Sequence, residues 1–128
     1  MFKILKYKTE KEECPIDLFI VDLIKNGRKD EVDKIYFYIK LLENNGDKIL
    51  INQNWAKKIS ESIFELRPKS NRILYFSLSD DSYILLHGFK KKTQKTPKSE
   101  IEKAEKEMND FKRRCILWVK KNSIYLRT

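Results

Sequence analysis

The sequence has no long hydrophobic run. Its longest unbroken apolar segments are only five residues, Ile35–Ile39 and Cys115–Val119, whereas a membrane-spanning helix needs about 20. The N-terminal residues Met1–Lys6 contain no continuous apolar stretch long enough for a signal peptide. We therefore expect a cytoplasmic protein with no membrane contact.

Cysteine and histidine are also scarce. Cys14 and Cys115 lie far apart, and no cysteine or histidine spacing around them is typical of a zinc site or a disulfide framework. The sequence has no glycine-rich phosphate loop, Walker pattern, nucleophile elbow or HExxH motif. It also has no carboxylate pair near its most basic segment, so we expect neither a metal ion nor another cofactor.

What the sequence does contain is an apolar fraction of 41% and a strongly uneven charge. The apolar fraction is enough for a core, and 128 residues are enough for one domain, residues 1–128. Residues 1–48 hold ten basic and ten acidic residues, so the net charge of +9 belongs entirely to residues 49–128. A segregated positive surface favours polyanionic partners, nucleic acid and the ribosome first, although it can also serve solubility alone.

The hydrophobic periodicity of the first half predicts one strand and two helices. Residues 2–9 alternate roughly as a strand does. Pro15 is well placed in the first turn of a helix that ends near Asn26-Gly27, and a second helix runs over residues 29–43 before Asn45-Gly46. Two antiparallel helices joined by a short link form a helical hairpin.

The second half predicts a three-stranded meander, residues 62–67, 72–78 and 82–92, separated by two polar turns. Thr96 as cap and Pro97 then open a last helix that extends to about Lys121, while residues 123–127 form either part of this end or a short strand. The order β-α-α-β-β-β-α predicts an α+β domain with a twisted antiparallel sheet, a helical hairpin and a C-terminal helix. Residues 113–128 form a C-terminal extension.

The meander predicts a cationic end of the sheet. Symmetric turns place Arg67 opposite Arg72, Arg72 opposite Phe89 and Leu74 opposite His87. Arg67, Arg72, His87 and Lys91 then project from one face, while Lys90 and Lys92 point to the other. A slip of one residue exchanges the two sets.

The residues near this end of the sheet each allow a functional and a structural interpretation. Opposed arginines either grip a phosphodiester with their planar donors or pair with Glu65 or with a carboxylate of the last helix. His87 is either a catalyst or a structural residue, and one of the crowded lysines 90–92 either acts as a base or is merely solvated. The aromatic rings of Tyr75, Tyr83 and Phe89 either stack on bases or belong to the core.

Three sequence blocks carry a resemblance to a known family. In order they are Phe64-Glu65-Leu66-Arg67-Pro68, Arg72-Ile73-Leu74-Tyr75-Phe76 and the segment Leu85 to Pro97, which reads LLHGFKKKTQKTP. Over about residues 2–112 the chain resembles HigB toxins of the RelE/ParE superfamily, including phage-derived relatives. These are toxin components of type II toxin–antitoxin systems.

The resemblance implies a RelE-like fold and a metal-independent mRNA interferase that cuts messenger RNA in the ribosomal A site. It also implies a HigA-type antitoxin with a helix-turn-helix domain, and contact with operator DNA only through that antitoxin. The resemblance implies that the family's functional residues correspond to Arg67, Arg72 and the basic residues Lys90, Lys91 and Lys92 at the end of the last strand. Where many relatives have a tyrosine or histidine, this chain has Thr93, Gln94 and Lys95.

The expected reaction is attack of the 2′-hydroxyl on the adjacent phosphorus, giving a 2′,3′-cyclic phosphate and a 5′-hydroxyl. The catalytic candidates are Arg67, Arg72, Lys91 and His87. The RNA-binding candidates are Lys69, Lys90, Lys92, Thr93 and Lys95. Two rival functions remain open: inhibition of DNA gyrase, as in the ParE branch, and RNA binding without catalysis.

Overall fold

The computed structural model describes residues 1–122. Within them it has five strands and four helices. In chain order they are β1 (Lys3–Lys6), α1 (Pro15–Lys25), α2 (Lys29–Asn45), α3 (Asp47–Asn52), β2 (Ala56–Lys58), β3 (Phe64–Leu66), β4 (Asn71–Ser79), β5 (Ser82–Lys90) and α4 (Lys98–Asn122). The strand considered for residues 123–127 lies outside the described residues.

The strands form a single mixed sheet in the order β1-β5-β4-β3-β2. The pairs β5–β4 and β4–β3 are antiparallel, as the meander predicts, and β2, which was not predicted, pairs antiparallel with β3. The sheet is not wholly antiparallel, however, because β1 pairs in parallel with β5. Parallel neighbours need a long crossover, and here α1, α2, α3 and three strands supply it.

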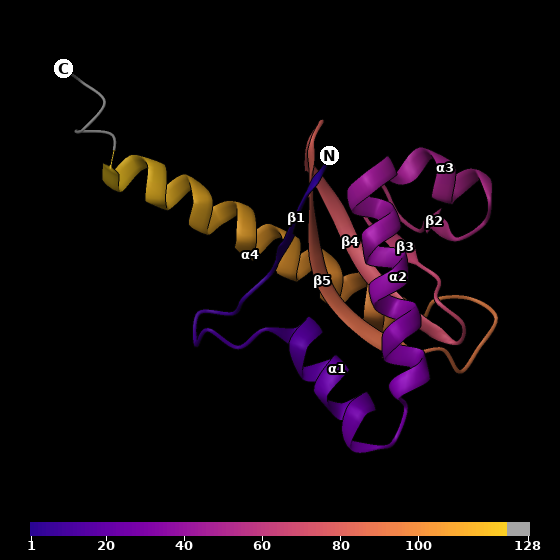
Figure 1. The fold of residues 1–128 in the computed structure, drawn as a ribbon. Helices are drawn as coiled ribbons and strands as arrows, with labels where there is room; N and C mark the ends of the chain where they lie inside the picture. The colour runs from indigo at the N-terminus through magenta and orange to yellow at the C-terminus, as the bar shows by residue number, and fades with distance from the viewer. Residues whose placement is uncertain (123–128) are drawn as a thin grey trace.

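Helices cover both faces of this sheet (Figure 1). The hairpin of α1 and α2, together with α3, packs over one face, and α4 crosses the other. Alternate residues of β4 therefore enter different cores: Ile73 and Tyr75 face the hairpin, while Leu74 and Phe76 face α4. The architecture is α+β and is compatible with a RelE-like fold.

The predicted hairpin is present because the residues that begin and end its helices give strong signals. Pro15 occupies the first turn of α1, and Gly46 ends α2 with a φ of 73°, a left-handed conformation that suits glycine. The predicted order lacked two short elements, α3 and β2. They were missed because six helical residues and three strand residues are too few to show a period.

The predicted register of the two long strands is confirmed. Arg72 pairs with Phe89 and Leu74 with His87. A bulge follows, since Tyr75 then pairs with Leu85. Tyr75 and Tyr83 belong to the core: they are 0% and 6% exposed, and both hydroxyls bond the carboxylate of Asp47, Tyr75 at 3.0 Å and Tyr83 at 3.3 Å.

Helix α4 is much longer than the part of it that packs against the sheet. Its 25 residues span about 37 Å at 1.5 Å per residue, and its far half extends beyond the rest of the domain (Figure 1). In residues 1–122, no helix combines the length and apolar character needed to cross a membrane.

Candidate nucleic-acid interface

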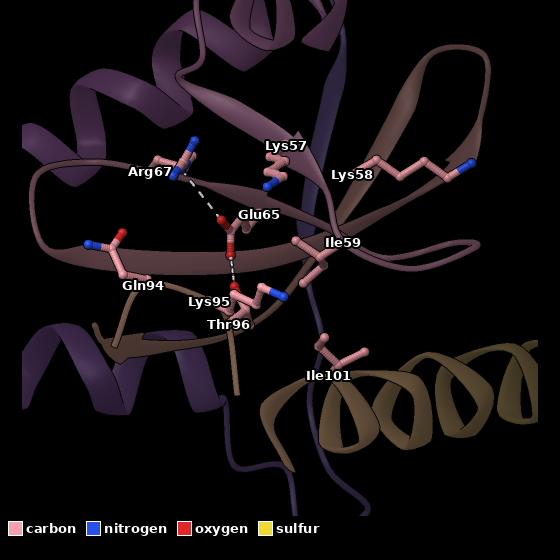
Figure 2. A pocket seen from close by; sticks show the side chains of 9 residues that line it. All are labelled: Lys57, Lys58, Ile59, Glu65, Arg67, Gln94, Lys95, Thr96 and Ile101. Carbon is pink, nitrogen blue, oxygen red and sulfur yellow. Dashed lines mark hydrogen bonds and ion pairs between the residues drawn. The ribbon is translucent and has the colours of Figure 1, made fainter. Parts of the chain in front are cut away.

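A cavity of about 240 Å³ opens beside β2 and β3, next to the loop that leads into α4. Its walls are basic and polar, with two isoleucines on one side. The lining residues are Lys57, Lys58, Ile59, Glu65, Arg67, Gln94, Lys95, Thr96 and Ile101 (Figure 2). Segments far apart in the sequence thus meet around one hollow.

Glu65 is the organising residue of this cavity. It lies on β3 and is 3% exposed. Its Oε2 atom is 3.5 Å from Nε of Arg67 and 3.6 Å from Nε of Arg72. Its Oε1 atom accepts a hydrogen bond from the hydroxyl of Thr96, and Figure 2 shows Arg67 and Thr96 on opposite sides of the carboxylate. One carboxylate therefore holds two guanidinium groups and the loop before α4.

The two arginines differ in access to the cavity. The Arg67 side chain is 28% exposed and lines the cavity. Arg72 is buried and directs Nη1 to the carbonyls of Lys69 at 3.0 Å and Asn71 at 2.7 Å. Burial lowers the pKa of Arg72, and the Glu65 carboxylate opposes that shift. Arg67 can touch a ligand directly, whereas Arg72 lies behind Glu65 and supports it.

The charge of the cavity remains positive after internal pairing. Four lining residues are basic, namely Lys57, Lys58, Arg67 and Lys95. Among the described lining residues Glu65 is the one acid, and it is shared with Arg72. A site with surplus cations around one fixed guanidinium suits a phosphate group.

Two of the predicted RNA-binding lysines lie elsewhere, on the hairpin side of the sheet. Nζ of Lys69 lies 3.2 Å from Asp30, and Nζ of Lys90 lies 2.5 Å from Glu31. The Lys69 ammonium lowers the pKa of Asp30, and the Lys90 ammonium, followed by Asn71, lowers that of Glu31. These lysines fasten the end of the sheet to α2.

Three other candidates line a second, open hollow. Lys91, Lys92 and Thr93 surround it together with Gln94, which also lines the main cavity. The backbone N–H of Lys91 donates to the carbonyl of Ser70 at 2.7 Å. The structure thus places Lys91 beside the cavity but not among its lining residues, and Lys95 within it.

His87 is buried between two carboxylates of α4. It is 2% exposed, with Nδ1 at 2.6 Å from Glu107 and Nε2 at 2.9 Å from Glu100. Both ring nitrogens therefore have partners within the domain. This placement agrees with the structural interpretation of His87, which ties β5 to α4.

Sequence reasoning missed Lys57, Lys58 and the role of Thr96. The two lysines lie on a three-residue strand with no detectable alternation, and their basic dipeptide was the one available signal. Thr96 was expected to cap α4, but its hydroxyl bonds Glu65, and α4 begins at Lys98 after Pro97. The contact depends on residues 31 positions apart, which no local pattern reveals.

The fold and the cavity define a small α+β domain with a cationic site beside the short strands of its sheet. The sequence pattern of the family described as "Phage derived protein Gp49-like (DUF891)" matches residues 22–109, more than half of the chain. The chain belongs to this Gp49-like family, which is associated with RelE-like toxins. Among curated proteins, none matches the chain.

Proposed function

We propose that this protein is the toxin of a type II toxin–antitoxin system, of HigB type, and that it cuts messenger RNA on the ribosome. The observation that carries the proposal is the cavity in which surplus basic side chains surround the Glu65–Arg67 pair. Membership of the Gp49-like family supports it. A HigA-type antitoxin is the proposed neutralising partner.

In this proposal Arg67 grips the scissile phosphate. Its Nε points to Glu65, and its planar guanidinium retains other donors for a phosphate oxygen. Lys57 and Lys95 add positive charge at the cavity wall. These cations stabilise the extra negative charge of the pentacoordinate state more than the ground state, which is what accelerates the reaction.

Glu65 is the proposed general base. It accepts the proton of the 2′-hydroxyl, the 2′-oxygen attacks phosphorus, and the bond from phosphorus to the 5′-oxygen breaks. The Lys95 ammonium donates a proton to the departing 5′-oxygen, leaving a 2′,3′-cyclic phosphate and a 5′-hydroxyl. This assignment replaces Lys91 and His87, since Glu65 lines the cavity and neither Lys91 nor His87 does.

The ribosome supplies the remaining geometry in this scheme. Cleavage of this kind requires the 2′-oxygen, phosphorus and 5′-oxygen to be in line, and holding reactants in such an arrangement accounts for much of a barrier. A codon held in the A site arrives with its backbone constrained. A small open cavity with a single carboxylate can then suffice for the chemistry.

The test is primer extension on total RNA after brief expression. We expect new 5′ ends in phase with codons of translated messages. Arg67→Ala should lower cleavage by about 10²- to 10³-fold, the usual cost of losing such a donor. Arg28→Ala is the matched control, because Arg28 is an exposed arginine in the link between α1 and α2, and it should cut normally.

Other outcomes would overturn the proposal. Intact messages together with induction of the DNA-damage response would identify a gyrase inhibitor. Intact messages and RNA binding alone would identify a non-catalytic module. Co-expression of a HigA-type protein should restore growth if that partner is correctly assigned.

A further inference from the structure

The far half of α4 leaves the domain. Its buried residues end at Met108, and Phe111 is the last side chain packed against a core cluster. Residues 112–122 continue the helix for about 16 Å at 1.5 Å per residue. They also lie beyond the residues that match the Gp49-like family, so membership of that family does not account for them.

This projecting segment is unusually apolar for an exposed helix. Ile116, Leu117, Trp118 and Val119 are 56%, 51%, 66% and 52% exposed. Successive helical residues are about 100° apart, so these four side chains surround most of the helix. Exposed apolar clusters of this kind mark interaction surfaces.

A groove lies where the segment leaves the sheet. It has a volume of about 320 Å³ and runs between the chain around β1 and the side of α4. Met108, Phe111, Cys115 and Trp118 follow one helical stripe, which is covered by the sheet at its start and lines the groove further on. The lining residues are Lys6, Lys8, Phe111, Arg114, Cys115 and Trp118.

The surroundings of the groove are cationic. Residues 112–122 contain five basic residues and no acid, and Lys6 and Lys8 form the opposite wall. Asp110 and Glu10 pair with Arg113, and Asp110 also pairs with Arg114 at 2.7 Å. These acids hold the helix against the N-terminal segment. Lys6 is also paired, with Asp17 at 2.7 Å, so Lys8 is the cation of the groove that no carboxylate of the described residues pairs with.

We propose that this groove and the projecting end of α4 bind an acidic amphipathic segment of a partner protein. Apolar side chains of the partner would cover Phe111 and Trp118, and its carboxylates would face Lys8, beside the already paired Lys6 and Arg114. A second copy fits less well, because residues 112–122 contain no acid, so joining the apolar ends of two α4 helices brings basic residues of both copies together without adding a carboxylate. A lipid surface fits less well, because the groove is concave and the apolar side chains surround the helix.

The experiment uses the full chain carrying Trp55→Phe, which leaves Trp118 as its single tryptophan. The probe is a synthetic peptide with leucines along one helical face and glutamates elsewhere. We expect saturable binding, a blue shift of Trp118 emission and protection of the exposed Cys115 from a maleimide reagent. Cys14 is buried and supplies the unreactive reference.

Two variants localise the binding. Trp118→Ala and Lys8→Glu should each weaken peptide affinity by about tenfold or more, the scale of one lost anchor. Because Trp118→Ala removes the fluorophore, binding is also followed by anisotropy of a labelled peptide. Lys25→Glu, on the exposed side of α1, is the matched charge control and should leave affinity unchanged.

Four results would overturn the inference. The first is equal binding of a peptide whose leucines are replaced by serine, since charge alone would then explain it. The second is unchanged affinity in both test variants. The third is a Trp118 blue shift with phosphatidylserine vesicles but not with the peptide. The fourth is a dimer that Trp118→Ala dissociates.

Discussion

At the scale of single residues, the contacts of Glu65 matter for both stability and the proposed chemistry. It is a buried carboxylate that neutralises part of two guanidinium groups and receives a hydroxyl hydrogen bond. Removing such a charge leaves its buried partner uncompensated, and breaking a buried pair typically costs about 3–5 kcal/mol. A single residue therefore affects both folding and the proposed chemistry.

Glu65→Gln tests both contributions, because cleavage and stability can be measured on the same variant. We expect RNA cleavage to fall by about 10²-fold or more because the amide cannot accept the 2′-hydroxyl proton, together with a lower free energy of unfolding. Thr96→Val is the control, since it removes the hydroxyl and keeps the carboxylate. Cleavage at the parental rate by a folded Glu65→Gln protein would show that another group is the base.

Asp110 links α4 to the N-terminal segment and makes stability depend on pH. The hydroxyl of Tyr7, at 2.6 Å, and the nearby Arg114 and Arg113 lower the pKa of Asp110 below its usual 3.8. Burial, and then the hydrogen bond to Asp110, raises the pKa of Tyr7 to about 12. Because the pKa of Asp110 is lower in the folded protein, the ionised carboxylate stabilises the fold fully above pH 3.8. This stabilisation is lost as the pH falls through the pKa of Asp110 in the folded protein.

Asp110→Asn should consequently destabilise the protein most at neutral pH. We expect a loss of about 1 kcal/mol at pH 7, reduced by solvent screening of a partly exposed group. The loss should shrink as the pH falls below 3.8, and urea unfolding at several pH values measures it. Asp33→Asn, which removes an exposed i,i+4 pair with Lys29, should change little at any pH.

At the scale of elements, the docking of α1 on β5 depends on a glycine. A Cβ atom built on Gly88 would lie 2.5 Å from Cδ2 of Phe19 and 2.9 Å from Cδ1 of Ile73. The helix therefore approaches the strand at a distance that a side chain forbids. Because Gly88 has no side chain, the Phe19 ring can pack directly against β5.

Gly88→Ala should lower the free energy of unfolding by about 1–3 kcal/mol, the range for an overpacked core. Phe19→Leu in the same chain should recover part of that loss by shortening the side chain that the new methyl group meets. Thermal or chemical unfolding of the two single variants and the double variant gives the coupling. Strict additivity would contradict the packing explanation.

The sequence predicts elements whose signals are local and misses contacts that are not. Pro15 and the apolar stripe of α1 are local, and so is the turn that sets Arg72 opposite Phe89. The parallel pairing of β1 with β5 joins residues about 80 positions apart, and no periodicity encodes it. No local pattern predicts the cavity either, because Lys57, Glu65 and Thr96 come together only through the tertiary fold.

At the scale of the whole molecule, the basic residues serve several different roles. Some lysines of residues 49–128 link the sheet to α2 and others line the cavity, while Arg114 lines the groove at α4. The net charge of +9 therefore overstates the number of cations available to RNA. The cavity itself offers four, Lys57, Lys58, Arg67 and Lys95.

RNA binding should accordingly show a modest salt dependence. Four phosphate contacts to a single strand predict that log K falls with log salt at a slope of about −2.8. Lys57→Ala should reduce that slope by about 0.7, whereas Lys25→Ala should leave it unchanged. Titrations of a labelled single-stranded RNA at several salt concentrations measure both, and a far steeper slope would show that the other lysines also touch RNA.

The parallel partnership of β1 and β5 also has a consequence for biosynthesis. The strand made first can join the sheet only after residues 82–85, its partners, have been made. Glu65 receives its Thr96 hydrogen bond later still. A growing chain therefore lacks a complete sheet until residues 82–85 have been made, and under the proposed function a new copy can act on RNA only after its message has been translated past Thr96.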